Sequence, residues 1–155
     1  MATQVPVKIT TTEKLAVNIR KATAQDLYAI EVFIEQFVAT GDVLPRTLGE
    51  LEQLYPTCYV AEYDGEIVGT AILEVYSWKL AEIRSLCVSP TVQGQGVGKR
   101  LVTACVELAR ERDILEVMAI TRSEEFFASC GFDFTLPSMK KALFLQTRDD
   151  LTHNE

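Results

Sequence analysis

The chain has 155 residues, of which 48% are hydrophobic and 24% are charged, and this composition is typical of one globular domain. Its net charge of −7 argues against nonspecific nucleic-acid binding, which needs clustered Lys and Arg side chains. The longest apolar stretches are far shorter than the roughly 20 residues that span a bilayer. Residues 1–20 lack the apolar core of a secretory signal, so we expect a cytoplasmic protein without a membrane segment.

The cysteines are too widely spaced to form a metal-binding or redox motif. No Cys-x-x-Cys pair occurs, and the single histidine, His153, stands near the C-terminal end. The sequence therefore predicts no bound metal ion, and thiols that are buried in a reducing compartment. The four cysteines are Cys58, Cys87, Cys105 and Cys130.

Hydrophobic periodicity and turn signals predict alternating strands and helices. Apolar residues recur at helical spacing between Leu27 and Val38, after a capping-box-like start at Thr23. Asp64-Gly65 is a strong signal for a two-residue hairpin. The expected strands are 17–20, 58–63, 67–76, 80–88, 114–120, 132–136 and 142–146, and the expected helices are 23–38, 48–54, 99–112 and 124–129.

This order of elements predicts an α/β (α+β) fold. A mixed, mostly antiparallel central β-sheet with helices on both faces fits it. Strands 80–88 and 114–120 flank a helix, so we expect them to form a parallel, right-handed βαβ unit. Residues 17–146 are expected to form one domain between an N-terminal arm, residues 1–16, and a tail, residues 147–155.

Three alternating glycines follow strand 80–88, in the stretch Gln93-Gly94-Gln95-Gly96-Val97-Gly98. Glycine leaves the backbone free to adopt positive φ and lets a ligand approach the amides. A helix that begins after them directs its unpaired N–H groups and its positive dipole end at this turn. The stretch therefore predicts a socket for a phosphate or pyrophosphate, although a tight turn without a ligand is the alternative.

The spacing of this glycine stretch excludes two nucleotide motifs. A dinucleotide fingerprint requires Gly-x-Gly-x-x-Gly, whereas the spacing here is Gly-x-Gly-x-Gly. A mononucleotide P-loop requires Ser or Thr after Gly-Lys, whereas Arg100 follows Gly98-Lys99.

The stretch instead resembles the Gln/Arg-x-x-Gly-x-Gly/Ala signature of the GCN5-related N-acetyltransferase (GNAT) family, which binds acetyl-CoA. Phe126 to Phe132 resembles the family's second signature, aromatic-x-x-x-Gly-Phe. The resemblance covers residues 17–146 and implies the acyl-CoA N-acyltransferase fold, with a bulge in the strand before the loop. It implies that this strand positions the pantetheine arm and that the loop binds the pyrophosphate of the cofactor. The cofactor-binding residues expected from it are Leu86, Cys87, Val88, Gln93, Gly94, Gln95, Gly96, Val97, Gly98, Lys99 and Phe127.

Acetyl transfer to an amine requires a base for the ammonium and a proton for the leaving thiolate. The resemblance places Glu82 at the position of a catalytic glutamate, although a strand-end glutamate in an ion pair is the alternative. Many family members have a tyrosine where this chain has Phe127, which cannot donate a proton. Tyr76, Cys130 or water remain as sources of that proton.

The acceptor is suggested by a second resemblance, to stand-alone N-acetylglutamate synthase catalytic domains. It rests on Leu44-Pro45-Arg46-Thr47, Glu82-Ile83-Arg84-Ser85-Leu86 and Ile120-Thr121-Arg122. Arginine pairs with a carboxylate in a bidentate way, so Arg46, Arg84 and Arg122 are expected to bind the carboxylates of L-glutamate. The alternative for each arginine is a surface residue or a structural ion pair.

Two other functions remain open from the sequence. The chain could acetylate another acceptor, such as a polyamine, an aminoglycoside or a protein N-terminus, or it could be a non-catalytic acyl-CoA-binding module. Function must be argued from the site, because one fold serves many functions. A homodimer is common in such folds, but no stretch of this sequence specifies one.

Overall fold

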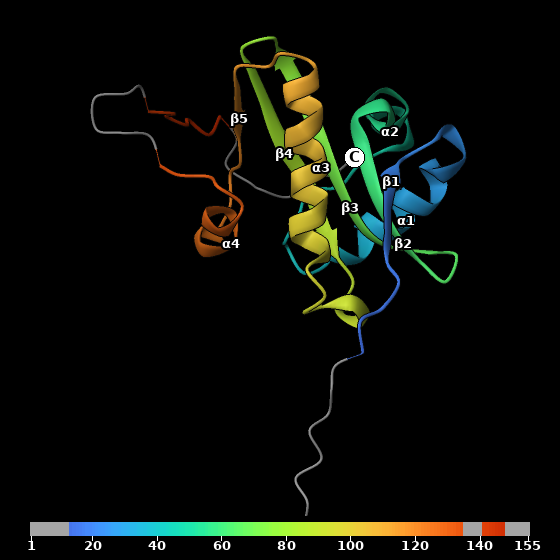
Figure 1. The fold of residues 1–155 in the computed structure, drawn as a ribbon. Helices are drawn as coiled ribbons and strands as arrows, with labels where there is room; N and C mark the ends of the chain where they lie inside the picture. The colour runs from blue at the N-terminus through green and yellow to red at the C-terminus, as the bar shows by residue number, and fades with distance from the viewer. Residues whose placement is uncertain (1–12, 135–140, 148–155) are drawn as a thin grey trace, which may run out of the picture.

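A five-stranded sheet lies between two layers of helices in the computed structural model of the chain (Figure 1), which describes residues 13–134 and 141–147. The expected arm and tail fall largely outside these residues. The strands are β1 (Asn18–Lys21), β2 (Cys58–Tyr63), β3 (Glu66–Ser77), β4 (Leu80–Val88) and β5 (Glu116–Met118). The helices are α1 (Leu27–Val38), α2 (Leu48–Leu54), α3 (Val97–Glu111) and α4 (Glu124–Ser129).

The strands lie in the sheet in the order β1-β2-β3-β4-β5, so each strand pairs with its neighbour in sequence. The first three pairings are antiparallel and only β4 and β5 run parallel, which confirms the mixed sheet expected from the sequence. The β2–β3 hairpin turns at Asp64-Gly65, where both residues have positive φ. The parallel pair needs a crossover connection, and α3 supplies it.

The sheet has a separate core on each face. Ala71 and Leu73 of β3 pack in the cluster that contains the buried residues of α3. Ile72, which lies between them in sequence, packs with Ile30 and Ile34 of α1. Alternate residues of a strand point to opposite faces, so the apolar run in β3 serves both helical layers.

The helices begin within a few residues of the positions that the sequence predicts. Thr47 and Glu50 form a capping box at the start of α2, in which the Thr47 side chain accepts a hydrogen bond from the Glu50 N–H group. Asp26 accepts a hydrogen bond from the Thr23 N–H group, at 2.7 Å, in the short 3₁₀ turn before α1. Helix α4 is followed by Gly131 at φ 93°, the left-handed residue that commonly ends a helix.

The two C-terminal strands expected from the sequence are wrong where the structure describes them. Residues 132–134 and 142–146 have no strand assignment, while 135–136 lie outside the described residues. The expected strand 114–120 is also shorter, since only β5 is paired. Leu143, Phe144 and Leu145 are 74–92% exposed. Their apolar character predicted a strand, but a strand also requires a hydrogen-bonding neighbour.

None of the helices in the described part of the chain is both long and apolar enough to cross a membrane.

Candidate active site

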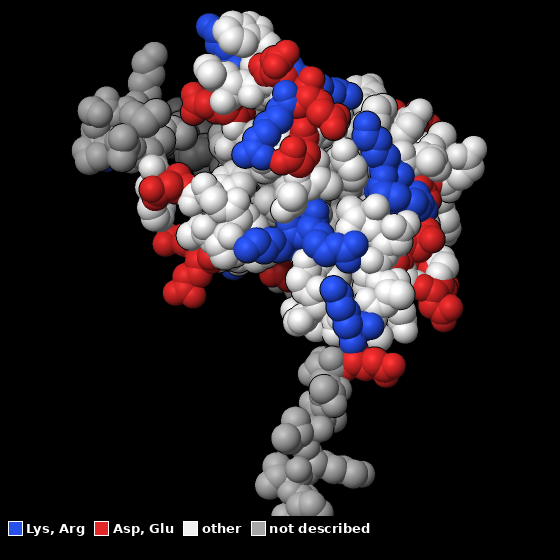
Figure 2. All heavy atoms as spheres, viewed as in Figure 1, with Lys and Arg blue, Asp and Glu red and all other residues white. Residues whose placement is uncertain are grey.

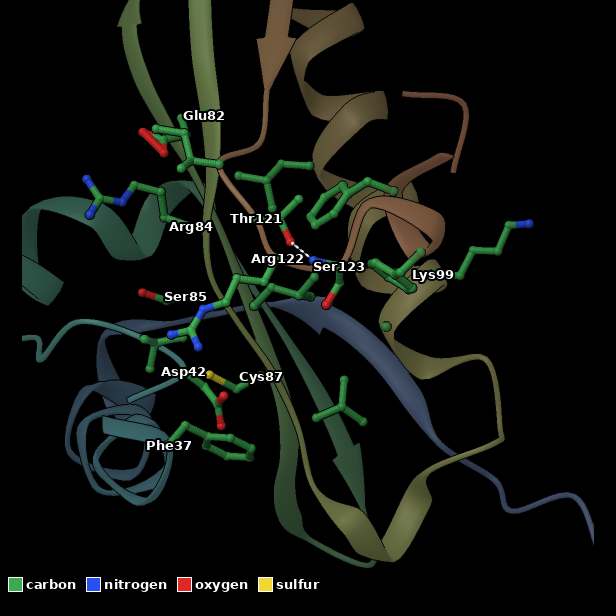
Figure 3. A pocket seen from close by; sticks show the side chains of 18 of the residues that line it. Phe37, Asp42, Glu82, Arg84, Ser85, Cys87, Lys99, Thr121, Arg122 and Ser123 are labelled. Carbon is green, nitrogen blue, oxygen red and sulfur yellow. Dashed lines mark hydrogen bonds between the residues drawn. The ribbon is translucent and has the colours of Figure 1, made fainter. Parts of the chain in front are cut away.

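A cleft opens where β4 and β5 separate. The two strands pair only over Leu80–Glu82 and Glu116–Met118, and β4 continues without β5 as far as Val88. The cleft measures about 1330 Å³ (Figure 3). It is lined by β4, by the glycine loop (residues 93–98), by the α1–α2 loop and by the segment that leads into α4. It therefore brings together segments that are far apart in sequence.

A bulge in β4 faces this cleft. Thr70 of β3 pairs with Cys87 and Ile72 pairs with Arg84, so Ser85 and Leu86 together lie opposite one residue of β3. Ser85 has a φ of 50°, a conformation that a residue with a side chain rarely adopts. The bulge expected from the family resemblance is thus present, and strain of this kind often accompanies a functional site.

Two side chains that the sequence analysis did not single out for this role hold the bulge. The buried Thr70 hydroxyl donates to the Ser85 carbonyl oxygen at 2.8 Å. Arg46 Nε donates to Ser85 Oγ at 3.2 Å. A lone threonine within the apolar run of β3 was the only local signal, and it does not reveal which carbonyl the hydroxyl meets.

The glycine loop has the backbone geometry of an anion socket. Gly94 and Gly96 have φ values of 76° and 72°, and α3 begins directly after Gly96. A Cβ atom on Gly98 would lie 3.3 Å from the ring of Phe126, so glycine lets α3 approach α4 closely. The first N–H groups of α3 have no partner within the helix and are directed at the loop.

Most residues expected to bind the cofactor line the cleft, but two side chains do not point into it. Gln95 is absent from the lining and hydrogen-bonds to the N-terminal segment instead. Lys99 contributes to the lining, yet its side chain extends away from the other labelled residues (Figure 3). The lining residues from that expected set are Leu86, Cys87, Val88, Gln93, Gly94, Gly96, Val97, Gly98, Lys99 and Phe127.

Two of these lining residues, Phe127 and Cys87, are also buried. The Phe127 ring packs edge-on against Phe126 and Phe132, with ring centroids 5.1 and 5.2 Å apart. Burial raises the pKa of the Cys87 thiol to about 12, so this cysteine stays protonated and is a poor nucleophile.

Glu82 lies on β4 at the far end of the cleft from the glycine loop. The residue is only 6% exposed, and its Oε1 accepts a hydrogen bond of 2.6 Å from the Tyr76 hydroxyl. Burial and this hydrogen bond to Glu82 raise the pKa of Tyr76 above its usual value. The tyrosine therefore stays protonated at neutral pH and donates to the carboxylate, which fixes the orientation of Glu82.

Glu74 joins two of the three expected substrate arginines. Its Oε2 lies 3.3 Å from Arg84 Nη1 and 3.7 Å from Arg46 Nη2. Arg46 is 8% exposed and also lies 3.9 Å from a carboxylate oxygen of Glu50. Glu74 is directly opposite Glu82 across the strands, so the two carboxylates share a face. The sequence analysis did not single out Glu74, because its partners depend on the register of β3 and β4.

Arg122 belongs to the opposite wall of the cleft. It follows β5, and its Nη2 donates to the Gly41 carbonyl oxygen at 3.2 Å. Figure 3 shows the side chain reaching across the cleft toward Asp42 and the α1–α2 loop. The three expected arginines thus surround one end of the cleft, but Arg122 is separated from the Arg46–Glu74–Arg84 group.

Positive and negative charges are mixed on the outer surface. Figure 2 shows Lys and Arg side chains interspersed with Asp and Glu on the face that carries α3. Within residues 13–134 and 141–147, no group of His, Cys, Asp and Glu side chains is placed to hold a metal ion. The charged groups that matter for the site are therefore those at the cleft, where Arg46 and Arg84 pair with Glu74.

Comparison with known proteins identifies the family. Residues 24–132 match the acetyltransferase (GNAT) family. An uncharacterized N-acetyltransferase of Chlorobaculum tepidum is 31% identical over 74% of each chain. An amino-acid acetyltransferase of Mycobacterium tuberculosis is 32% identical over 74% of this chain and 67% of its own. The chain spans about a quarter of the length of the amino-acid acetyltransferases of Ralstonia nicotianae and Neisseria meningitidis that it also matches.

Solved structures share the fold and contain the cofactor. Rv2747 from M. tuberculosis, in complex with CoA and a second ligand, superposes with a TM-score of 0.71 at 30% identity, over 81% of this chain and 76% of that one. N-acetylglutamate synthase from Neisseria gonorrhoeae, complexed with CoA and N-acetyl-glutamate, gives 0.68 at 30% identity over 76% of this chain and 28% of that one. The chain therefore belongs to the acetyltransferase (GNAT) family and is an N-acetyltransferase that uses acetyl-CoA.

Proposed function

We propose that the chain transfers the acetyl group of acetyl-CoA to the α-amine of L-glutamate or a similar acidic amino acid. One observation carries this proposal: a buried glutamate and three arginines line the same cleft as the glycine loop. An anion socket at one end and cations at the other suit an anionic cofactor and an anionic acceptor. The likeness to amino-acid acetyltransferases supports the same acceptor class.

In the proposed reaction, Glu82 acts as the general base. The acceptor amine arrives as an ammonium, which Glu82 deprotonates directly or through one water molecule. The free amine attacks the thioester carbonyl carbon, a C–N bond forms, and the C–S bond to CoA breaks. Tyr76 is a positioning residue here, because its hydroxyl holds the Glu82 carboxylate in one orientation.

The leaving thiolate requires a different proton donor in this proposal. Phe127 has no proton to give, and the Tyr76 hydroxyl is engaged with Glu82. We assign this step to water, which the open cleft admits. The cofactor-binding residues act chiefly through the backbone: the bulge at Ser85 positions the pantetheine arm, and the amides from Gly94 to Lys99 bind the pyrophosphate.

The carboxylates of the acceptor are assigned to the arginines. Arg84 is the most available of the Glu74 group, since it is more exposed than Arg46 and has one partner carboxylate. Arg122 lies on the other wall and could bind the second carboxylate. Glu74 then occupies the place of a substrate carboxylate, and the acceptor must displace it from Arg84.

A thiol-release assay with acetyl-CoA and a panel of amino acids and amines tests this proposal. We expect L-glutamate to be preferred over glutamine, lysine and polyamines. Arg84→Ala should raise KM for glutamate about 10- to 100-fold, in line with the loss of a charged hydrogen-bonded contact. Arg110→Ala is the matched control, because Arg110 is an exposed arginine that pairs with Glu107 on the outside of α3. A glutamate KM that is the same in both variants would contradict the acceptor assignment.

A second candidate, a cationic acceptor, is favoured by one specific observation. Glu50, Glu74 and Glu82 carry three negative charges at the acceptor end and offset the charges of Arg46 and Arg84. The same assay separates the two candidates. Turnover with a polyamine or an aminoglycoside that exceeds turnover with every acidic amino acid would establish this second function.

A further inference from the structure

The N-terminal segment, residues 13–17, lies against the glycine loop and the first turn of α3. Gln95 Oε1 accepts a hydrogen bond from the Leu15 N–H group at 3.0 Å, and Gln95 Nε2 donates to the Glu13 carbonyl oxygen at 3.3 Å. The Gln95 amide thus pairs with the segment as a neighbouring peptide group would. These contacts join residues that are about 80 positions apart in the sequence.

The other end of the segment is fixed to α3 and to the core. Arg100 Nη1 donates to the Val17 carbonyl oxygen at 2.9 Å. The Val17 side chain is buried in the core cluster that contains α3, and Leu15 packs against that cluster. Figure 1 shows the segment passing beside the turn that leads into α3. The segment is therefore held at two points, one of which is the loop itself.

Ordering the glycine loop costs conformational entropy. Gln95 lies between Gly94 and Gly96, and both glycines adopt left-handed φ values. Glycine loses more conformational freedom on ordering than any other residue, so a loop rich in glycine is costly to fix for ligand binding. A loop that is already ordered binds its ligand more tightly, because less entropy is lost on binding.

We propose that residues 13–17 form a clamp that holds the glycine loop in its cofactor-binding conformation. Gln95 is then a positioning residue: its side chain acts on the segment and does not contact CoA, whereas its backbone amide belongs to the loop assigned to the pyrophosphate. Arg100 likewise serves the segment through Val17 and not the phosphates. This inference rests on the cofactor alone and holds for any acceptor.

Calorimetric titration with CoA, without acceptor, tests the clamp. Gln95→Met removes both hydrogen bonds at nearly constant size, and Leu15→Pro removes the N–H donor from the other partner. Leu15→Pro should weaken CoA binding about fivefold, the size expected for one hydrogen bond, and Gln95→Met should weaken it at least as much, because it removes two. The double variant should bind no more weakly than Gln95→Met alone, because both changes break the same contact.

Three comparisons make the outcome decisive. Leu15→Ala keeps the N–H group and measures the side-chain contribution alone. Gln93→Met changes the neighbouring glutamine, which reaches Val88 and lines the cleft, so its effect should add to that of Leu15→Pro. Amide hydrogen exchange at residues 94–98 without CoA should speed up in Gln95→Met, which a direct ligand role would not cause.

Kinetic constants provide the last readout. KM for acetyl-CoA should rise, while kcat at saturating acetyl-CoA stays within about twofold, as expected when only binding changes. Additive losses for Gln95→Met and Leu15→Pro would overturn the proposal, because the Gln95 side chain would then contact CoA itself. Unchanged CoA affinity in Gln95→Met would overturn it as well, whether or not Leu15→Pro folds.

Discussion

The two ends of the cleft are built from different kinds of chemical group. The end that we propose binds the cofactor consists mainly of backbone: a bulged strand, two left-handed glycines and the first turn of a helix. The end that we propose binds the acceptor consists of side chains that already pair with one another, around Glu74 and Glu82. A backbone site depends on conformation and tolerates many sequences. A side-chain site depends on which charges meet, so we expect this end to decide the acceptor.

Glu82→Gln should have the largest effect and should act at the acceptor end alone. We expect kcat/KM near neutral pH to fall about 100-fold, the scale of general-base catalysis. The loss should shrink as pH rises, because more of the acceptor amine is then already deprotonated. Full pH–rate profiles with wild type and variant measure this. A profile that keeps its shape and height would remove Glu82 from the mechanism.

Gly96→Ala should act at the cofactor end alone. Gly96 has a φ of 72° with open space where a Cβ would lie, so alanine adds backbone strain without a clash. Such strain costs roughly 1–2 kcal/mol, so KM for acetyl-CoA should rise about tenfold. KM for the acceptor should stay unchanged. Equal changes in both constants would mean that the two ends are not separable.

Glu74→Gln should have a smaller effect of the opposite sign. The change removes the charge that pairs with Arg84 and Arg46 and that an acceptor carboxylate must displace. We expect KM for glutamate to fall about threefold, a scale typical of partly exposed ion pairs. Glu50→Gln is the control, since Glu50 is farther from Arg46 and is not paired with Arg84. A rise in KM would instead show that Glu74 binds the acceptor ammonium.

Asp26→Asn should leave both ends of the cleft unchanged and alter only stability. Hydrogen bonds from Arg20 lower the pKa of Asp26 to about 2, below its usual 3.8. This stabilisation is present in full above about pH 5 and is lost as pH falls through the unfolded-state pKa of 3.8 toward the folded-state pKa of about 2. Near neutral pH the variant should be less stable by up to about 2 kcal/mol. Denaturant titrations at pH 7 and pH 3 should show the difference between the proteins shrinking, with both KM values unaltered at pH 7.

Local sequence rules recovered most of the scaffold. Capping residues, hairpin glycine and hydrophobic spacing located the four α-helices and five strands of the described residues to within a few residues, and the fold class followed from their order. The strands expected at 132–136 and 142–146 were wrong in their described parts. Those segments are apolar, but no local rule supplies the neighbouring strand that a sheet requires.

Long-range pairing accounts for what the sequence analysis did not find. Glu74 lies opposite Glu82 and close to Arg84 because of the register of β3 and β4. Thr70 reaches the Ser85 carbonyl oxygen because β4 bulges between Arg84 and Cys87. Gln95 was expected to bind the cofactor, but its side chain contacts the N-terminal segment. Each of these contacts joins residues that no short sequence window contains.

The sequence by itself determined the conformations that depend on neighbouring residues: where helices begin, where glycine permits positive φ, and hence the presence of a glycine loop before α3. Only the tertiary structure decided which charged side chains meet, which carboxylate pairs with the arginines, and which segment contacts the loop. The physical reason is the separation along the chain over which each kind of interaction acts. Backbone preferences act over a few residues, whereas hydrogen bonds and ion pairs across a sheet depend on register and packing that the whole chain sets.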